Sequence, residues 1–248
     1  PGIGTLRQSL DPPIFQGGST ECVLGCDLQG RDILSRIIHG ARVSLVVAFF
    51  AIAIAGGTGV TLGLAAGYFG GLVDALVMRL VDIWYALPSI LLALILVVVL
   101  GPGLLNVILV IGITLWAFYA RLVRAEVLTV RQLDYVALAQ VAGSSGFRIA
   151  VRHILPNVFN SVIIVATLQV GGVILFEASL SFLGLGVPVS VTSWGQMVAD
   201  GRQYVTTAWW LAAWPGIAIT LTVLCFNLFG DWLRDYLDPK LRQVVQAG

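Results

Sequence analysis

Five long apolar stretches constrain this chain more than any other feature of its sequence. They lie at 43–66, 75–100, 104–120, 158–175 and 209–229. A helix needs roughly 17 to 25 mostly apolar residues to cross the hydrocarbon core of a bilayer. None of the stretches shows the twofold alternation that the strands of a membrane barrel require. The sequence therefore predicts an all-α polytopic membrane protein with five visible transmembrane helices.

The composition supports the same prediction. Hydrophobic residues make up 58% of the 248 residues and charged residues only 11%, whereas a soluble domain is about 25% charged. Because the net charge is +1, no basic surface for nucleic acid is expected, and membrane lipid is the expected surrounding. Three cysteines are too few for a disulfide scaffold.

The polar segments define the expected domain organisation. We expect a lead-in at 1–42, a membrane domain at 43–229 with loops at 121–157 and 178–208, and a tail at 230–248. Short loops rich in Lys and Arg remain in the cytoplasm, and these residues are more frequent around the 121–157 loop and the tail. The lead-in and the 178–208 loop are therefore predicted to face outward. An outward lead-in favours a further span upstream over a translocated N-terminus.

The 121–157 loop has the pattern of two short helices. Tyr135, Val136, Leu138, Ala139 and Ala142 fall on one helical stripe. Gly143 is a candidate C-cap of the first helix, and Ser144 or Ser145 a candidate N-cap of the second, which Pro156 ends before the next span. Such a pair could dock into a groove of another protein and pass a rigid-body movement to the spans that it joins. The alternative is an amphipathic segment that only anchors on lipid headgroups.

This loop resembles the cytoplasmic "EAA" loop of bacterial ATP-binding-cassette importer permeases. The pattern of that loop is E-A-A, three residues, G, nine residues, I-x-L-P. Ala139, Gly143, Leu155 and Pro156 are in register with it. Ala137, Leu138 and His153 stand where the family has Glu, its first Ala and Ile.

Three further segments resemble the branch of that family that imports peptides and nickel. They are LGCDLQGRDILSRIIHGARVSL at 24–45, EASLSFLGLG at 177–186 with SWGQM at 193–197 and GR at 201–202, and NLFGDWLRDYLDPK at 227–240. The resemblance covers 24–242 and is closest to the second permease subunit of dipeptide and oligopeptide importers.

The resemblance implies a six-span subunit of the bacterial cytoplasmic (inner) membrane, the first span lying upstream of the lead-in. Its expected partners are a homologous permease subunit, two ABC ATPase subunits or one fused chain, an extracytoplasmic substrate-binding protein and the peptide substrate. ATP and Mg²⁺ would bind to the ATPases, since no phosphate-binding G-x-x-x-x-G-K-[ST] loop occurs here. The subunit is therefore expected to be non-catalytic and to bind no cofactor. The residues expected at the ATPase contact are Tyr135, Ala139, Gly143, Ser144, Ser145, Phe147 and Arg148.

Two classes of alternative remain open. Within the family, the substrate could be nickel, glutathione or an oligosaccharide. A secondary transporter would carry ionisable groups in the membrane for ion coupling, and the spans here are nearly free of charge at mid-depth.

Single residues in and near the spans give further hypotheses. Pro88 would kink the second span, either as a gate or as a static bend. Glu177 would lie at the outer mouth of the pathway or mark the membrane interface. Arg79 would form an ion pair with Asp82 or Asp74 along one helix. Alternatively, these charged side chains would extend into the lipid headgroups.

Cysteines and histidines give the remaining hypotheses. Cys22 and Cys26 could form a local disulfide on the outward side, or remain two unpaired thiols. His39 and His153 have no partners at metal-ligand spacing, so no metal site is expected.

Overall fold

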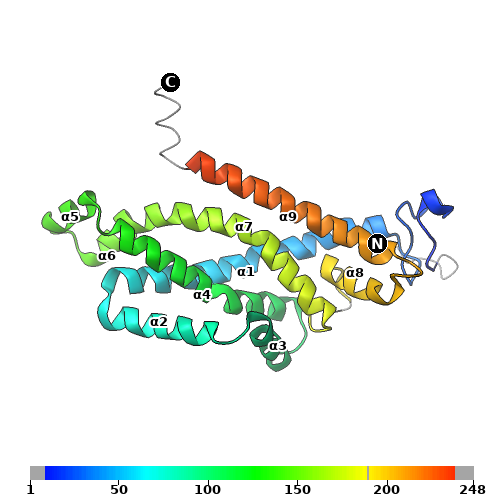
Figure 1. Cartoon of the computed structure of the whole chain (residues 1–248), viewed down its shortest axis with the longest axis horizontal. Coiled ribbons are helices and arrows are strands. Elements are labelled where there is room, and N and C mark those ends of the chain that lie inside the picture. Colours follow the sequence, from blue (N-terminus) through cyan, green and yellow to red (C-terminus); the bar gives the residue numbers. More distant parts are fainter. Residues whose placement is uncertain (1–8, 189, 238–248) are drawn as a thin grey trace, which may run out of the picture. The chain divides into compact units, whose positions relative to one another are not determined.

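The structure is a computed structural model that describes residues 9–188 and 190–237 (Figure 1). The all-helical class is confirmed for these residues, where the only β-pairing is an isolated antiparallel bridge between Cys26 and Asp32. The helices are α1 (Ile33–Phe69), α2 (Gly71–Tyr85), α3 (Ser89–Leu100), α4 (Leu104–Val130), α5 (Asp134–Val141), α6 (Gly146–Ile149), α7 (Leu155–Phe182), α8 (Trp194–Gly201) and α9 (Trp210–Leu237). Short 3-10 turns lie at Ile14–Gln16 and Arg202–Tyr204, and a π turn lies at Ala150–Ile154.

Four helices in the described part are long and apolar enough to cross a membrane. They are α1, α4, the continuous helix Gly146–Phe182 and α9. A fifth span results only if α2 and α3 are counted together, because the two helices are bent by 90°.

The predicted kink at Pro88 is a complete break in the structure. α2 ends at Tyr85 and α3 begins at Ser89, so the expected span at 75–100 is not one kinked helix. A proline ring clashes with the preceding helical turn and disfavours helical backbone at the residue before it. Leu87 accordingly lies outside both helices.

Several helices extend beyond the predicted spans into the expected loops. α1 begins at Ile33 because the side chain of Asp32 accepts a hydrogen bond from the backbone N–H of Ser35 at 2.8 Å, which caps the helix. α4 continues to Val130 and α9 to Leu237. The rest of the predicted tail, 238–248, lies outside the described residues, as do residues 1–8 of the lead-in.

The chain divides into two compact units. Unit 1 comprises Pro1–Phe50, Ala93–Ile111 and Val170–Cys225, and unit 2 comprises Ala51–Leu92, Gly112–Gln169 and Phe226–Gly248.

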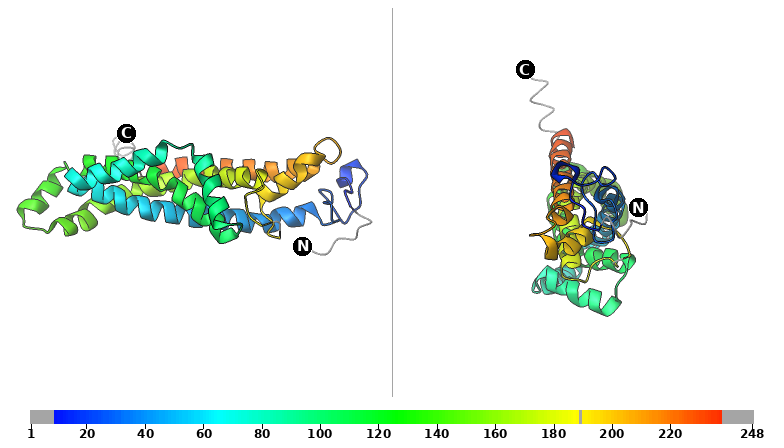
Figure 2. Two further views of the ribbon diagram at one scale, coloured as in Figure 1. Left: turned by 90° about the horizontal axis from the view of Figure 1, so that it is seen from below. Right: turned by 90° about the vertical axis from the view of Figure 1, so that its right-hand side faces the viewer.

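In unit 1 the described part of the lead-in packs against the start of α9, and both views of Figure 2 place the blue lead-in close to that helix. The indole N–H of Trp210 donates to the carbonyl of Cys26 at 3.3 Å. Trp194, the first residue of α8, donates from its indole to the carbonyl of Ile37 on α1 at 2.8 Å. The two segments predicted to face outward therefore fold together.

In unit 2 a stripe of glycines brings α1 against α4. A Cβ atom added to Gly59, Gly63 or Gly67 would come within 3 Å of backbone or Cβ atoms of α4. Small residues at i, i+4 and i+8 allow such close helix packing in membranes. Gly56 and Gly57 do not belong to this contact, because a Cβ there would meet nothing within 4 Å.

Ion pairs join α2 to α4, and they replace the predicted pairs along one helix. Asp74 accepts from Nε and Nη2 of Arg124, the latter at 2.7 Å. Asp82 accepts from Nη2 of Arg121 at 2.8 Å. The hypothesis of a pair between Arg79 and Asp74 or Asp82 is therefore wrong, because both carboxylates turn towards the arginines of the neighbouring helix.

Candidate functional site

The glycine of the predicted coupling segment stands at a sharp end of α5. Gly143 has φ +78°, in the left-handed region that favours glycine. Its N–H donates to the carbonyl of Gln140 at 3.0 Å, and the N–H of Ser144 donates to that of Ala139 at 3.1 Å. These two bonds form a Schellman motif, which satisfies the last carbonyls of the helix. Gly143 therefore ends α5 through its left-handed backbone conformation and these two hydrogen bonds.

The helix after Gly143 is not a separate short one. Ser145 has the extended backbone of an N-cap, without a side-chain capping bond. From Gly146 the chain stays helical through the π turn into α7, giving one helix over Gly146–Phe182. Pro156 lies inside this helix as the second residue of α7, which follows the wider π turn, and does not end the helix as expected.

Three large apolar side chains are exposed around the turn at Gly143. Leu138, Val141 and Phe147 are 68%, 87% and 74% exposed, and we call these three residues the docking face. Of the residues on the predicted stripe, Val136 is buried and Leu138 is exposed. Of the predicted contact residues, Tyr135, Gly143, Ser145, Phe147 and Arg148 are exposed, and Ala139 and Ser144 are partly buried.

The sequence interpretation missed Leu138 and Val141 as contact candidates. Their only signal in the sequence is that they are apolar residues of a short helix. Apolar residues of such a helix normally lie on its buried face. Which face is covered depends on neighbouring elements that are distant in sequence.

A hydrogen-bond network joins α5 to the start of α7. The hydroxyl of Tyr135 donates to the carbonyl of His153 at 3.3 Å. The side-chain amide of Asn157 donates both to the Tyr135 hydroxyl at 3.0 Å and to the same carbonyl at 2.8 Å. Partial loss of solvent around the Tyr135 hydroxyl raises its pKa, so the hydroxyl keeps the proton that it donates. These hydrogen bonds connect α5 to the first residues of the spanning helix.

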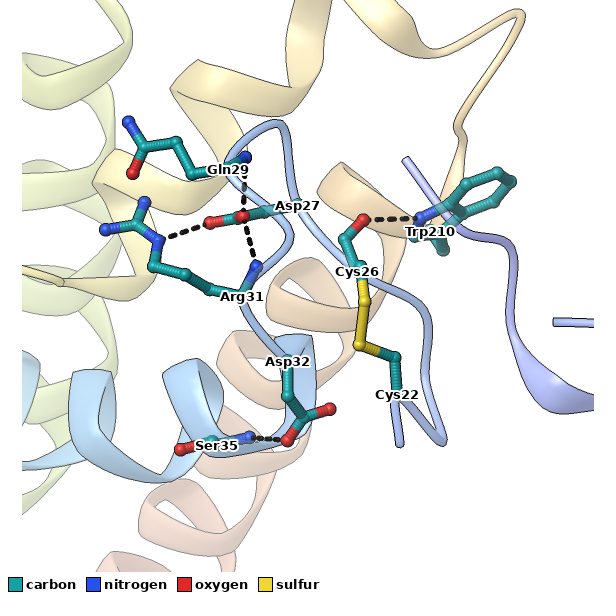
Figure 3. The surroundings of a disulfide bond; sticks show 8 residues. All are labelled: Cys22, Cys26, Asp27, Gln29, Arg31, Asp32, Ser35 and Trp210. Carbon is teal, nitrogen blue, oxygen red and sulfur yellow. Dashed lines mark hydrogen bonds and ion pairs between the residues drawn. A yellow bond between two sulfur atoms is a disulfide. The ribbon is translucent and has the colours of Figure 1, made fainter. Parts of the chain in front are cut away.

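In unit 1 a disulfide closes the turn of the lead-in (Figure 3). Cys22 and Cys26 are bonded, with their Cα atoms 5.5 Å apart. The next residue, Asp27, is buried and accepts from the backbone N–H groups of Gln29 and Arg31, each at 2.8 Å. Its other oxygen accepts from Nε of Arg31 at 2.7 Å and from Nη1 of Arg36 at 2.8 Å.

Glu177 does not lie at an open outer mouth in the structure. Its side chain is fully buried in unit 1, and it accepts from the hydroxyls of Ser181 at 2.8 Å and Ser193 at 3.0 Å. Ser193 also caps α8 by accepting from the N–H of Gln196. The carboxyl group therefore joins α7 to the start of α8, because serines at both positions turn towards it.

Asp27 and Arg36 were also not predicted from the sequence to be a pair of buried charges. The only signal for them was their place in the lead-in segment at 24–45, which contains four acidic or basic residues before the first predicted span besides Arg42. Arg36 also forms an ion pair with Asp200. This contact depends on the position of α8, so no local sequence pattern predicts it.

The chain is similar to known transport proteins over most of its length. The family model described as binding-protein-dependent transport system inner membrane component matches residues 59–243. The di/tripeptide transport system permease protein DppC of Pseudomonas aeruginosa is 46% identical over 95% of this chain and 78% of its own length. The glutathione transport system permease protein GsiD of Pectobacterium atrosepticum is 43% identical over 92% of this chain and 75% of its own length.

Solved structures show the same fold. Inward-facing MetNI methionine ABC transporter has a chain that matches with a TM-score of 0.68 and 18% identity, over 83% of this chain and 98% of that chain. An amino acid ABC transporter matches with a TM-score of 0.64 and 13% identity, over 82% and 95%.

Proposed function

The chain belongs to the family of binding-protein-dependent transport system inner membrane components, and on that premise we propose that it forms half of the pathway of an ATP-driven importer of di- and oligopeptides. The identity to a di/tripeptide permease over 95% of the chain supports this substrate class. The other half would come from a homologous permease, and a substrate-binding protein would deliver the peptide from outside.

We propose that the docking face seats in a groove of an ABC ATPase subunit, which holds ATP and Mg²⁺. The observation that carries this proposal is the exposure of three large apolar side chains around the turn at Gly143, Leu138 and Val141 on α5 and Phe147 on α6. α5 itself is held at both ends. One end is the Schellman turn at Gly143, and the other is the link of Tyr135 to α7. Closure of the ATPases would move α5, and α7 would follow, which switches the pathway between inward- and outward-open states.

The finer topology belongs to the same proposal. Counting the bent pair α2–α3 as one gives five spans, and the sixth span upstream stays a prediction of the family resemblance. The break at Pro88 would then be a flexing point between the two halves of one span.

The experiment introduces charge into the docking face. Val141→Glu would place a carboxylate in an apolar interface, which costs several kcal/mol unless it is paired. We expect the variant complex to lose at least about tenfold in ATPase affinity and to lose peptide uptake in proteoliposomes. The matched control is Val205→Glu, at an apolar residue of unit 1 that is 54% exposed. Normal ATPase binding by Val141→Glu would overturn the proposed contact.

Glutathione is a second candidate substrate, because the glutathione permease relative is 43% identical over 92% of the chain. Uptake of labelled dipeptide in the presence of excess glutathione distinguishes the two. Complete inhibition with direct glutathione uptake would favour glutathione as the substrate.

A further inference from the structure

Unit 1 contains a cavity of about 150 Å³ with charged walls. It lies between the lead-in, the first turns of α1, α8 and the start of α9. An engineered protein cavity of about this volume holds a benzene molecule. The polar residues that line the cavity are Asp27, Gln29, Arg31, Arg36 and Asp200. Met197 and Leu211 contribute apolar wall.

Arg36 lines this cavity, and one edge of its guanidinium makes no hydrogen bond within the described part of the chain. Arg36 is only 5% exposed. Its Nη1 donates to Asp27, but its Nε has no partner among the described residues. Its Nη2 is 3.6 Å from Oδ2 of Asp200, beyond the 2.7–2.9 Å of a charge-assisted hydrogen bond. Nε and Nη2 form the edge that binds a carboxylate through two parallel hydrogen bonds.

Neither acid of the cavity forms a hydrogen bond with that edge, and Asp200 contacts Nη2 only as an ion pair at 3.6 Å. Both oxygens of Asp27 already accept from the turn and from Arg31 and Arg36. Asp200 is held away, because its Oδ1 accepts from the side-chain amide of Gln196 at 2.8 Å. A buried donor without a partner is costly, so the edge favours an acceptor from outside the chain.

We propose that this cavity is a binding subsite for a carboxylate, and that its ligand is the terminal carboxylate of the peptide substrate. The inference rests on the proposed function in peptide import. Every linear peptide with a free C-terminus carries this group, and the volume admits the carboxylate with its Cα atom and a small side chain. Arg31 supplies a second cation, and Figure 3 shows Gln29 and Arg31 on the same side of Asp27, away from the disulfide.

The test uses the complete permease–ATPase complex in lipid nanodiscs without the binding protein. The probes are radiolabelled alanyl-alanine and alanyl-alaninamide, which differ only in the terminal group. We expect the amide to bind at least about tenfold more weakly, because it cannot form the charged two-bond contact. Gln29→Glu, which brings a competing carboxylate to the cavity, is expected to weaken alanyl-alanine binding to a similar extent. Arg36→Lys keeps the positive charge but removes the edge that forms two hydrogen bonds. If Arg36→Lys fails to fold, Gln29→Glu still tests the proposal.

The matched control is Gln203→Glu, which adds the same charge at an exposed residue that does not line the cavity. It is expected to bind alanyl-alanine like the wild type. Equal binding of acid and amide, unchanged binding by Gln29→Glu, or displacement by acetate at the same concentration as by the dipeptide would overturn the subsite. Binding-protein-dependent uptake by the wild type is measured in parallel. Its absence would overturn the proposed function, whereas uptake without any dipeptide binding in the nanodiscs would overturn the subsite alone.

Discussion

Gly143 is held in a backbone conformation that few other residues adopt. A Cβ there would meet nothing within 4 Å, so a substitution acts through φ and not through a clash. We expect Gly143→Val to strain the turn by about 1–2 kcal/mol and to lower peptide uptake per ATP hydrolysed several-fold. The ratio is measured in proteoliposomes that contain the whole transporter.

The matched control at this position is Gly143→Asn. Asparagine visits the left-handed region at little cost, so this variant is expected to couple ATP hydrolysis to uptake nearly as the wild type does. If both variants lose coupling equally, coupling depends on the absence of a side chain at this position and not on its backbone conformation.

At this scale the sequence predicted some residues better than others. The helix end at Gly143 was predictable because glycine followed by serines is a local signal. The partners of Asp74 and Asp82 were not, because Arg124 and Arg121 lie on another helix and spacing along α2 favoured Arg79. Local backbone chemistry is written in neighbouring residues, whereas contacts between helices are not.

Between elements, the link from α5 to α7 gives a second prediction. Tyr135→Phe removes the hydroxyl that contacts His153 and Asn157, with a loss of about 1 kcal/mol. We expect ATPase binding to persist and uptake per ATP to fall, while Tyr204→Phe in unit 1 leaves the ratio unchanged. Unchanged coupling in Tyr135→Phe would remove the link from the mechanism.

The same link predicts a pH dependence. Because partial burial raises the pKa of Tyr135 above the ordinary value of about 10, the contribution of the protonated hydroxyl is fully present below that value. It is lost only as the pH rises through the higher pKa of the folded state. The difference in coupling between wild type and Tyr135→Phe should therefore be constant from about pH 6 to 9. A difference that disappears in this range would contradict the assignment.

The two ion pairs between α2 and α4 should differ in strength. Asp74 binds Arg124 through two nitrogens and lies in the first turn of α2, where a negative charge is favoured. The pair of Asp82 and Arg121 is more exposed and has one hydrogen bond. We expect Asp74→Asn to cost about 1 kcal/mol, or roughly 2–4 °C in the thermal midpoint, and Asp82→Asn clearly less. Equal shifts in a thermal unfolding assay would contradict this order.

Element boundaries show why hydropathy predicts spans better than loops. The first turns of α1 contain polar residues such as Arg36 and His39, so hydropathy did not include them in the predicted span. The helix begins earlier because Asp32 caps it. The bend between α2 and α3 has a local cause in Pro88, but its angle of 90° depends on packing. Apolar length predicts that a helix exists, and contacts decide where it begins and how it bends.

At the scale of the whole molecule, the arginines predict which segments face the cytoplasm. The structure pairs Arg121 and Arg124 with aspartates of α2, and Arg131 donates to the carbonyl of Gly67. Arg148 and Arg152 remain exposed beside the docking face. The orientation rule counts Lys and Arg and not the net charge, so all of these arginines favour a cytoplasmic position for this region.

Single cysteines test this orientation in cells with an intact cytoplasmic membrane. Cys225, the free cysteine of the described part, is first replaced by Ala. A membrane-impermeant maleimide is expected to label Gln203→Cys from outside, and Val141→Cys only after the membrane is permeabilised. Both positions are exposed in the structure, so a difference in labelling reports the membrane and not burial. The opposite pattern would place the docking face outside, where no ATP-hydrolysing subunit could reach it, and would contradict the coupling mechanism together with the orientation.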